Sequence, residues 1–256
     1  MIYLIAILGA ALAGAINTLA GNGSAITLTI LTEVLGLPGN MANGTNRIGI
    51  ASQSMGATWA FYRNGKVDVR RDALAISLLT IGALFGVWVA TQVSNEEFKT
   101  VFRWLMVVML VVLLVKPKRW LRETDLDHRP PKWVTIPAFL ALGFYGGFIQ
   151  MGMGIFFLAV MVLLARYSLL DANVLKSFVV GLYTLLVIVV FQIHGLIDWK
   201  IGLLMAVGQT TGGWLTAHYA SNSPKANAWA YRVLVVIVLL AVLKLFGFHT
   251  YIWALL

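Results

Sequence analysis

Long apolar stretches, bounded by glycine, proline or charged residues, organise most of the chain. A helix needs about 20 predominantly apolar residues to cross about 30 Å of bilayer hydrocarbon. Most stretches approach that length and the segments between them are short, so the pattern predicts an all-α, polytopic transmembrane helix bundle. The predicted stretches are Ile2–Ala20, Ser24–Gly36, Asn40–Tyr62, Ala73–Val93, Phe98–Val115, Val134–Gln150, Ile155–Arg166, Ala172–Gln192, Trp199–Ala220 and Ala226–Phe246.

The two halves of the chain follow one plan. Ser24–Gly36 and Ile155–Arg166 are too short to cross alone, and each follows a glycine-containing interruption. A shift of 131 positions places Gly21 on Gly152 and Gly23 on Gly154, and such internal similarity indicates a duplication. We predict a first membrane repeat at 1–115, a basic cytoplasmic linker at 116–133 and a second repeat at 134–256. Each repeat contains an interrupted or re-entrant element and three full spans.

Basic residues predict the orientation of the bundle. They crowd the loops Arg63–Arg71 and Lys116–Lys132, which the positive-inside rule assigns to the cytoplasm, with Gln92–Glu97 outside. Re-entrant elements leave more basic residues inside than crossing elements do. The count favours two inverted repeats, the arrangement that builds a substrate site from broken helices near the midplane. Crossing elements and a parallel repeat stay open as alternatives.

Composition removes several classes of function. The chain is 60% hydrophobic and 11% charged, against about 25% charged residues in soluble domains. The net charge of +9 follows from the cytoplasmic loops, so no nucleic-acid partner is expected. There is no cysteine, and the four histidines lack metal-binding spacing. We predict no enzyme, cofactor or metal, although a hydrolase assembled from distant spans stays an alternative, and no cleaved signal peptide is expected because the start lacks a positive segment.

The paired interruptions are the first candidate for binding chemistry. A helix broken at membrane depth has unpaired backbone N–H groups that must face protein or a water-filled cavity. The helix that restarts there points its positive dipole end at the cavity, which suits an anion. The alternative is that the glycines only allow close helix packing.

Polar side chains inside apolar helices supply the other candidates. Asn43, Asn46 and Gln53 share one helix face, although each could instead join helices. Arg47 and Lys176 could attract an anion or serve as interfacial anchors, and Glu33 is expected to pair with Arg47. Asn17 and Thr18 could line the same vestibule. The candidate substrate-binding residues are Gly21, Asn22, Gly23, Ser24, Asn43, Asn46, Arg47, Gln53, Gln150, Gly152, Met153, Gly154, Asn173, Lys176 and Ser177.

The glycine-rich segments resemble those of the TauE/SafE sulfite exporter family. The residues that carry the resemblance are Ala13-Gly14, Ala20-Gly21-Asn22-Gly23-Ser24, Leu35-Gly36-Leu37-Pro38, Ala42-Asn43-Gly44-Thr45-Asn46, Gly146-Gly147, Gly152-Met153-Gly154 and Asp171-Ala172-Asn173. The family's first interruption is usually richer in glycine, whereas Asn22 and Ser24 occupy it here.

The resemblance implies a multi-pass permease in the cytoplasmic membrane of a prokaryote. It implies transport of a small anionic substrate, such as sulfite or an organosulfonate, by export. The expected partners are this anion and the lipid bilayer, with a homo-oligomer as an open option. An anion-conducting channel or facilitator is the alternative function, because a pore and a transporter can share the same spans.

Overall fold

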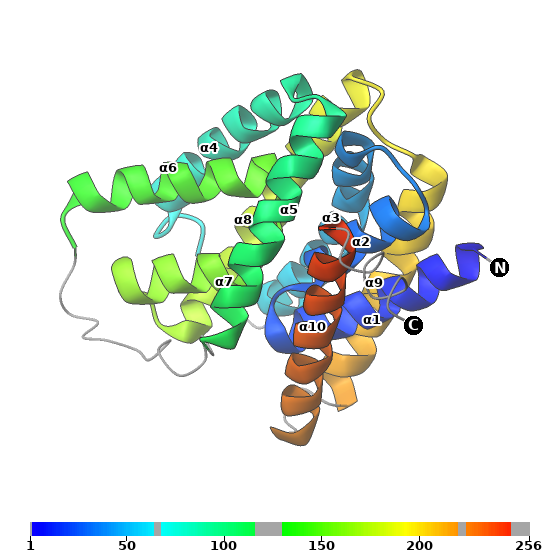
Figure 1. The fold of residues 1–256 in the computed structure, drawn as a ribbon. Helices are drawn as coiled ribbons and strands as arrows, with labels where there is room; N and C mark the ends of the chain where they lie inside the picture. The colour runs from blue at the N-terminus through cyan, green and yellow to red at the C-terminus, as the bar shows by residue number, and fades with distance from the viewer. Residues whose placement is uncertain (1, 64–67, 116–129, 220–223, 247–256) are drawn as a thin grey trace.

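The computed structural model describes residues 2–63, 68–115, 130–219 and 224–246. All regular elements in these ranges are helical, which confirms the predicted all-α class over that part of the chain (Figure 1). The first half contains α1 (Ile2–Ala20), α2 (Gly23–Thr29), the π-helix η1 (Ile30–Val34), α3 (Gly39–Arg63), α4 (Ala73–Gln92) and α5 (Asn95–Leu114). The second half contains α6 (Lys132–Phe148), α7 (Met153–Leu158), the π-helix η3 (Ala159–Leu164), α8 (Leu169–Ile193), α9 (Trp199–Tyr219) and α10 (Pro224–Leu245).

The helices lie close to the predicted apolar stretches. Most of the predicted linker, residues 116–129, lies outside the described residues. Its last part does not fit the prediction, because α6 begins at Lys132, directly after Pro131. Proline is tolerated at the start of a helix because its missing N–H would have no helical partner there.

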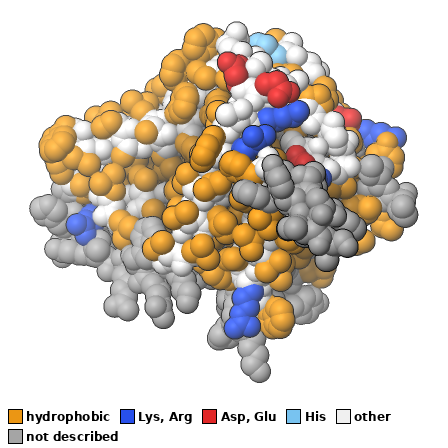
Figure 2. Space-filling view, viewed as in Figure 1, with side chains coloured by type: hydrophobic (Ala, Val, Ile, Leu, Met, Phe, Trp, Pro, Cys, Tyr) orange, Lys and Arg blue, Asp and Glu red, His pale blue; other side chains and the backbone are white. Residues whose placement is uncertain are grey.

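By length and hydropathy alone, two helices in the described ranges, α4 and α8, qualify as membrane spans. The polar residues inside α3, including Asn43, Asn46 and Arg47, keep its mean hydropathy lower. Large apolar side chains such as Trp88 and Ile193 are nevertheless exposed on the outside of the bundle. Figure 2 shows hydrophobic side chains over much of the visible face, with charged side chains in small groups. Such an apolar surface suits lipid rather than water.

The short helix in the first half folds back along α1. A Cβ atom added to Gly23 would lie 2.6 Å from the Cβ of Asn17, and one added to Gly9 would collide with Ile30. The start of α2 therefore lies beside the end of α1, and η1 lies beside its earlier part. In the second half, the rings of Tyr145 on α6 and Phe156 on α7 are 5.3 Å apart.

Glycines allow two pairs of helices from opposite halves to pack closely. Gly82 and Gly86 on α4 lie against backbone carbonyls of α6. Gly208 and Gly212 on α9 lie against backbone carbonyls of α1 in the same way. A Cβ atom at any of the four would collide with or crowd the partner helix, as expected where small residues bring helix backbones together. Each half therefore packs its broken helix against a full helix of the other half.

Both breaks end earlier than predicted, and the second also begins earlier. In the first, only Gly21 and Asn22 are non-helical, because the side chain of Asn17 accepts a hydrogen bond from the N–H of Gly23 (3.1 Å) and holds the start of α2. In the second, α6 ends at Phe148 and α7 begins at Met153. The predicted break residues Met153 and Gly154 are therefore helical, as are Gly23 and Ser24 in the first half.

Candidate functional site

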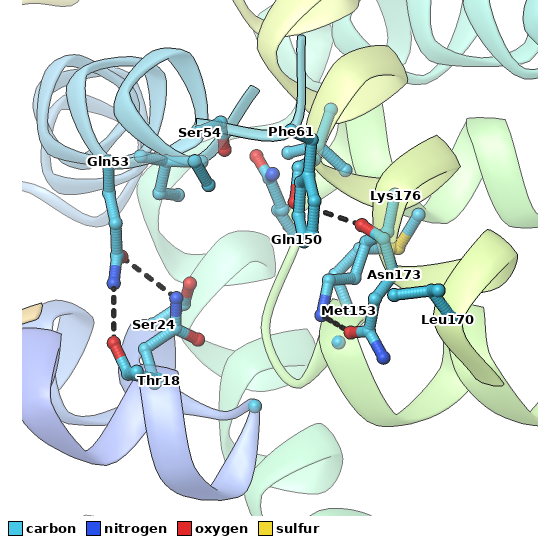
Figure 3. Close-up of a pocket in the computed structure, with 17 residues that line it drawn as sticks. Thr18, Ser24, Gln53, Ser54, Phe61, Gln150, Met153, Leu170, Asn173 and Lys176 are labelled. Atoms are coloured by element: carbon cyan, nitrogen blue, oxygen red, sulfur yellow. Dashed lines mark hydrogen bonds between the residues drawn. The ribbon is translucent and has the colours of Figure 1, made fainter. Parts of the chain in front are cut away.

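The two breaks and the helices α3 and α8 enclose a cavity of about 790 Å³ (Figure 3). Nine of the fifteen predicted site residues line it, and the other six do not. The lining residues are Asn17, Thr18, Gly21, Ser24, Ile50, Gln53, Ser54, Ala57, Phe61, Gln150, Met153, Gly154, Leu170, Asn173, Lys176, Ser177 and Val180. Both halves of the chain therefore contribute to one cavity, as the paired interruptions predicted.

Gly21 and Gly154 bring the two breaks into direct backbone contact at the cavity wall. A Cβ atom added to Gly154 would lie 3.0 Å from the Cα of Gly21 and would collide with its carbonyl oxygen. Gly21 also has a φ of +75°, a conformation that glycine adopts far more readily than other residues. These glycines are thus needed for packing, and they also line the cavity.

Asn17 and Gln53 form one polar wall of the cavity. The Nδ2 of Asn17 donates to the Oε1 of Gln53 (2.8 Å), which leaves the Gln53 amide nitrogen close to the carbonyl of Gly14 (3.3 Å) and the hydroxyl of Thr18 (3.5 Å). Figure 3 shows Gln53, Thr18 and Ser24 together on this side. The wall joins the end of α1 to the middle of α3.

Gln150, Asn173 and Lys176 form the opposite polar wall (Figure 3). Lys176 donates to the Oδ1 of Asn173 (2.8 Å), and the Nδ2 of Asn173 donates to the carbonyl of Leu169 (2.9 Å). Gln150 has a φ of +58°, which is rare for a residue with a side chain. Its Oε1 accepts a hydrogen bond from Arg47.

The carboxamide oxygens of the cavity wall are bonded within the protein, and the charge on the wall is positive. Each of the four carboxamide oxygens on its wall already accepts a hydrogen bond from the protein: those of Asn17, Gln53, Gln150 and Asn173. Among the described residues that line the cavity, Lys176 is the one charged residue and none is acidic. An ammonium group has three donors and no acceptor. The arrangement therefore suits a ligand that accepts hydrogen bonds and carries negative charge.

Arg47 lies behind the cavity wall, fully buried. It donates to the carbonyl oxygens of Gly146 (2.6 Å) and Gly147 (2.9 Å), as well as to Gln150. These two carbonyls belong to the last turn of α6, where carbonyl groups lack helical partners. The interpretation of Arg47 as an interfacial anchor is therefore wrong, because the guanidinium caps a broken helix inside the protein.

The polar side chains on one face of α3 do not all face the cavity, because Asn43 bonds α6 and Asn46 bonds α2. The Nδ2 of Asn43 donates to the carbonyl of Phe148 at the end of α6 (2.6 Å). Asn46 accepts from the hydroxyl of Thr27 on α2 (2.6 Å). Both side chains are fully buried and join helices, whereas Gln53, two turns further along α3, reaches the cavity.

Three predicted break residues also lie outside the cavity lining: Asn22, Gly23 and Gly152. Gly23 allows α2 to approach the backbone of Ala13. Gly152 has a φ of +67° and packs against Met109. Neither polar atom of the buried Asn22 side chain has a hydrogen-bond partner among the described residues.

The apolar part of the wall, together with Ser54, was not predicted from the sequence. Ile50, Ser54, Ala57 and Phe61 recur at helical spacing with Gln53 on α3, and Leu170 and Val180 do so with Asn173 and Lys176 on α8. Residues three or four apart lie on one helix face. The spacing around the polar candidates could therefore have identified these neighbours.

An ionic cluster joins the segment before α4 to the start of α8. Arg71 pairs with Asp72 (3.2 Å) and Asp171 (3.5 Å), and the hydroxyl of Tyr167 donates to Asp72 (3.1 Å). The hydrogen bond to Asp72 is the main reason that the pKa of Arg71 is raised, and burial raises the pKa of Tyr167.

Glu33 does not pair with Arg47. It lies 3.2 Å from the ammonium group of Lys244 at the end of α10. The expected pair is wrong because Arg47 points into the core toward α6, while η1 places Glu33 at the end of the bundle.

Comparison with known proteins identifies the family. A model of the family named sulfite exporter TauE/SafE matches residues 6–245. The probable membrane transporter protein ORF9 of Sinorhizobium sp is 29% identical over 215 residues, covering 82% of this chain and 79% of that protein. The probable membrane transporter protein YfcA of Escherichia coli K12 is 27% identical over 207 residues, covering 79% and 75%. No solved structure matches.

The family match extends from the first turns of α1 to the last residue of α10. It therefore includes both breaks and every residue of the cavity wall. The chain belongs to the sulfite exporter TauE/SafE family of membrane transporters.

Proposed function

We propose that this protein exports a small sulfur-containing anion, such as sulfite or an organosulfonate, and that the anion binds in the cavity between the two breaks. The observation that carries the proposal is the polarity of the wall: Lys176 is the one charge among its described residues, and the carboxamide oxygens of Asn17, Gln53, Gln150 and Asn173 each accept from a protein donor. A sulfonate or sulfite group offers acceptor oxygens and negative charge, so it complements the Lys176 ammonium group, which has three N–H donors and bonds Asn173 with one of them.

The apolar part of the wall supports an organic cargo as well as an inorganic one. Ile50, Phe61 and Leu170 line the cavity beside the polar groups. Binding sites for small molecules commonly combine an apolar lining with a few placed polar groups. The short carbon chain of an organosulfonate would contact the apolar side chains while its sulfonate reaches Lys176.

We infer that the halves are inverted repeats, each with a re-entrant hairpin. The first hairpin, α1 with α2 and η1, opens at one end of the bundle. There the ring of Tyr3 lies 4.6 Å from the ammonium of Lys200 at the start of α9, and Glu33 pairs with Lys244 at the end of α10. Both ends of the first hairpin, Tyr3 in α1 and Glu33 in η1, therefore lie at the same end of the bundle.

The second hairpin opens at the opposite end. Tyr167, which follows η3, contacts Asp72, which precedes α4. Between the first hairpin and that region runs α3, which has 25 residues and so spans roughly 37 Å. Because Arg70 and Arg71 lie at this second end, beside Asp72, the positive-inside rule assigns this end to the cytoplasm of a prokaryotic cell.

Alternating access follows from this arrangement. The cavity extends from the breaks to Phe61, near the end of α3, and Leu170, near the start of α8. In the proposed orientation, it therefore extends toward the cytoplasm, where an exported anion would enter. Rocking of one repeat against the other would then expose the same anion to the outside.

Counterflow in liposomes tests the function. Purified protein is reconstituted with labelled sulfite inside, and unlabelled sulfite, sulfoacetate or chloride is added outside. A transporter predicts saturable flux and faster exit of label with sulfite or sulfoacetate outside, but not with chloride. Large single-channel currents without counterflow would instead support the channel, and absence of any sulfite flux by correctly folded protein would contradict the proposal.

A further inference from the structure

Two cations lie in or beside the cavity, and neither has an acidic partner in the part of the chain that the structure describes. Arg47 is fully buried and donates to neutral oxygens of Asn43, Gly146, Gly147 and Gln150. Lys176 donates to the neutral amide of Asn173. The last turn of α6 offers a favourable dipole to Arg47, but neutral groups do not cancel its net charge.

The acidic residues that the structure describes are placed elsewhere. Each lies at a helix end or in a connecting segment, and the ion pairs among them are with Arg71, Lys99 and Lys244. These acidic residues are Glu33, Asp68, Asp72, Glu96, Glu97, Asp171 and Asp198. The positive charge at the centre of the bundle therefore has no fixed counter-charge in the described part of the chain.

An unpaired charge inside a protein is costly, so buried charges are normally paired or bind a ligand. Lys176 lines the cavity and can contact a ligand directly. Arg47 is separated from the cavity by one side chain, Gln150, which accepts from Arg47 and also lines the cavity. An anion that contacts Lys176 and Gln150 would thus lie in the field of both cations.

We propose that the cargo is bound as a doubly charged anion, paired directly with Lys176 and, through the amide of Gln150, with Arg47. This inference rests on the proposed function and specifies the charge of its substrate. Gln150 and Lys176 both line the cavity (Figure 3). A monovalent anion would leave one of the two positive charges uncompensated.

Sulfate and methanesulfonate provide a matched pair of probes. Both are tetrahedral sulfur compounds, but sulfate carries two charges and methanesulfonate carries one. Binding to purified native protein is measured by calorimetry at constant ionic strength. We expect sulfate to bind at least about tenfold more tightly. Equal affinity for the two anions would overturn this inference but would leave the proposed anion transport intact. If sulfate, methanesulfonate and sulfite all fail to bind, the proposed function itself is contradicted.

Substitution of Gln150 tests the role of the second cation. Gln150→Glu places a carboxylate beside Arg47 and neutralises it, so the preference for sulfate should fall to about threefold or less. Gln150→Met is the matched control, because it removes the amide without adding charge. Both anions should bind more weakly to this variant, but Arg47 keeps its charge, so the preference for sulfate should stay above that of Gln150→Glu. If the folded Gln150→Glu protein retains the native preference, Arg47 does not act on the cargo charge.

Discussion

Asn43 and Arg47 stabilise the end of α6 by bonding carbonyl groups that have no helical partner. The Asn43→Leu substitution would leave the carbonyl of Phe148 and one N–H group of Arg47 unsatisfied in the core. A buried unsatisfied polar group costs about 1–3 kcal/mol. We therefore expect a lower Tm for the purified variant, measured by thermal unfolding in detergent.

Glu96→Gln is the control for this substitution. Glu96 is exposed and pairs with Lys99 at 3.4 Å, and such surface pairs contribute about 0–1 kcal/mol. The control should unfold close to the native Tm. An Asn43→Leu protein as stable as the control would mean that the buried bonds to α6 contribute little.

The sequence predicted individual cavity residues better than their contacts. Gln53, Gln150 and Lys176 were identified because polar groups in apolar helices must avoid lipid. Arg47 was misinterpreted because its partners are backbone carbonyls about 100 positions away. Backbone carbonyls carry no signature in the sequence, so no motif could have indicated this cap.

At the scale of elements, the contact between the two breaks depends on the absence of a side chain at Gly154. The Gly154→Ala substitution would force α7 away from Gly21, because its Cβ would collide with that carbonyl oxygen. Steric insertion into a packed site typically costs about 1–3 kcal/mol. We expect a lower Tm and weaker sulfite binding, measured on the same purified sample.

Gly56→Ala on α3 is the matched control. A Cβ atom at Gly56 would have no neighbour within 4 Å, and alanine in a helix interior is favoured over glycine by about 0.5–1 kcal/mol. This variant should be at least as stable as the native protein. If Gly154→Ala behaves in the same way, the breaks do not depend on backbone contact.

The sequence predicted the existence of the broken elements but not their local form. Glycine pairs after apolar runs indicated two interruptions, and both are present. The π-helices η1 and η3 were not foreseen, because bonds such as Leu35 N–H to Ile30 O and Ala165 N–H to Val160 O leave no pattern in residue type. The position of the second break depends on Gln150, whose positive φ is unusual for glutamine.

At the scale of the whole molecule, the inverted arrangement predicts opposite locations for the starts of α1 and α6. Tyr3 and Trp133 are exposed, and the chain has no native cysteine. Tyr3→Cys should react with an impermeant thiol reagent added to intact cells, whereas Trp133→Cys should react only after permeabilisation. Asn95→Cys is the control for a position outside the cell, and Asp68→Cys is the control for a cytoplasmic position. Labelling of positions 3 and 133 from the same side would indicate parallel repeats.

The global arrangement was only partly readable from the sequence. The duplication indicated by matching glycines in the two halves stays a prediction. The packing of α1 on α9 and of α4 on α6 was not predicted, because it depends on glycines that contact backbone far away in the chain. Such pairing reflects shape rather than residue chemistry, so one sequence does not reveal it.

Binding of radiolabelled sulfite to purified Lys176→Met protein tests the central claim most directly. Lys200→Met is the matched control, since Lys200 is exposed and lies beside Tyr3 at an end of the bundle. A charge-assisted hydrogen bond contributes about 1.5–3 kcal/mol, so loss of Lys176 should weaken binding about 10- to 150-fold. Lys200→Met should bind like the native protein. Native affinity in a correctly folded Lys176→Met variant would contradict the assignment of this cavity as the anion site.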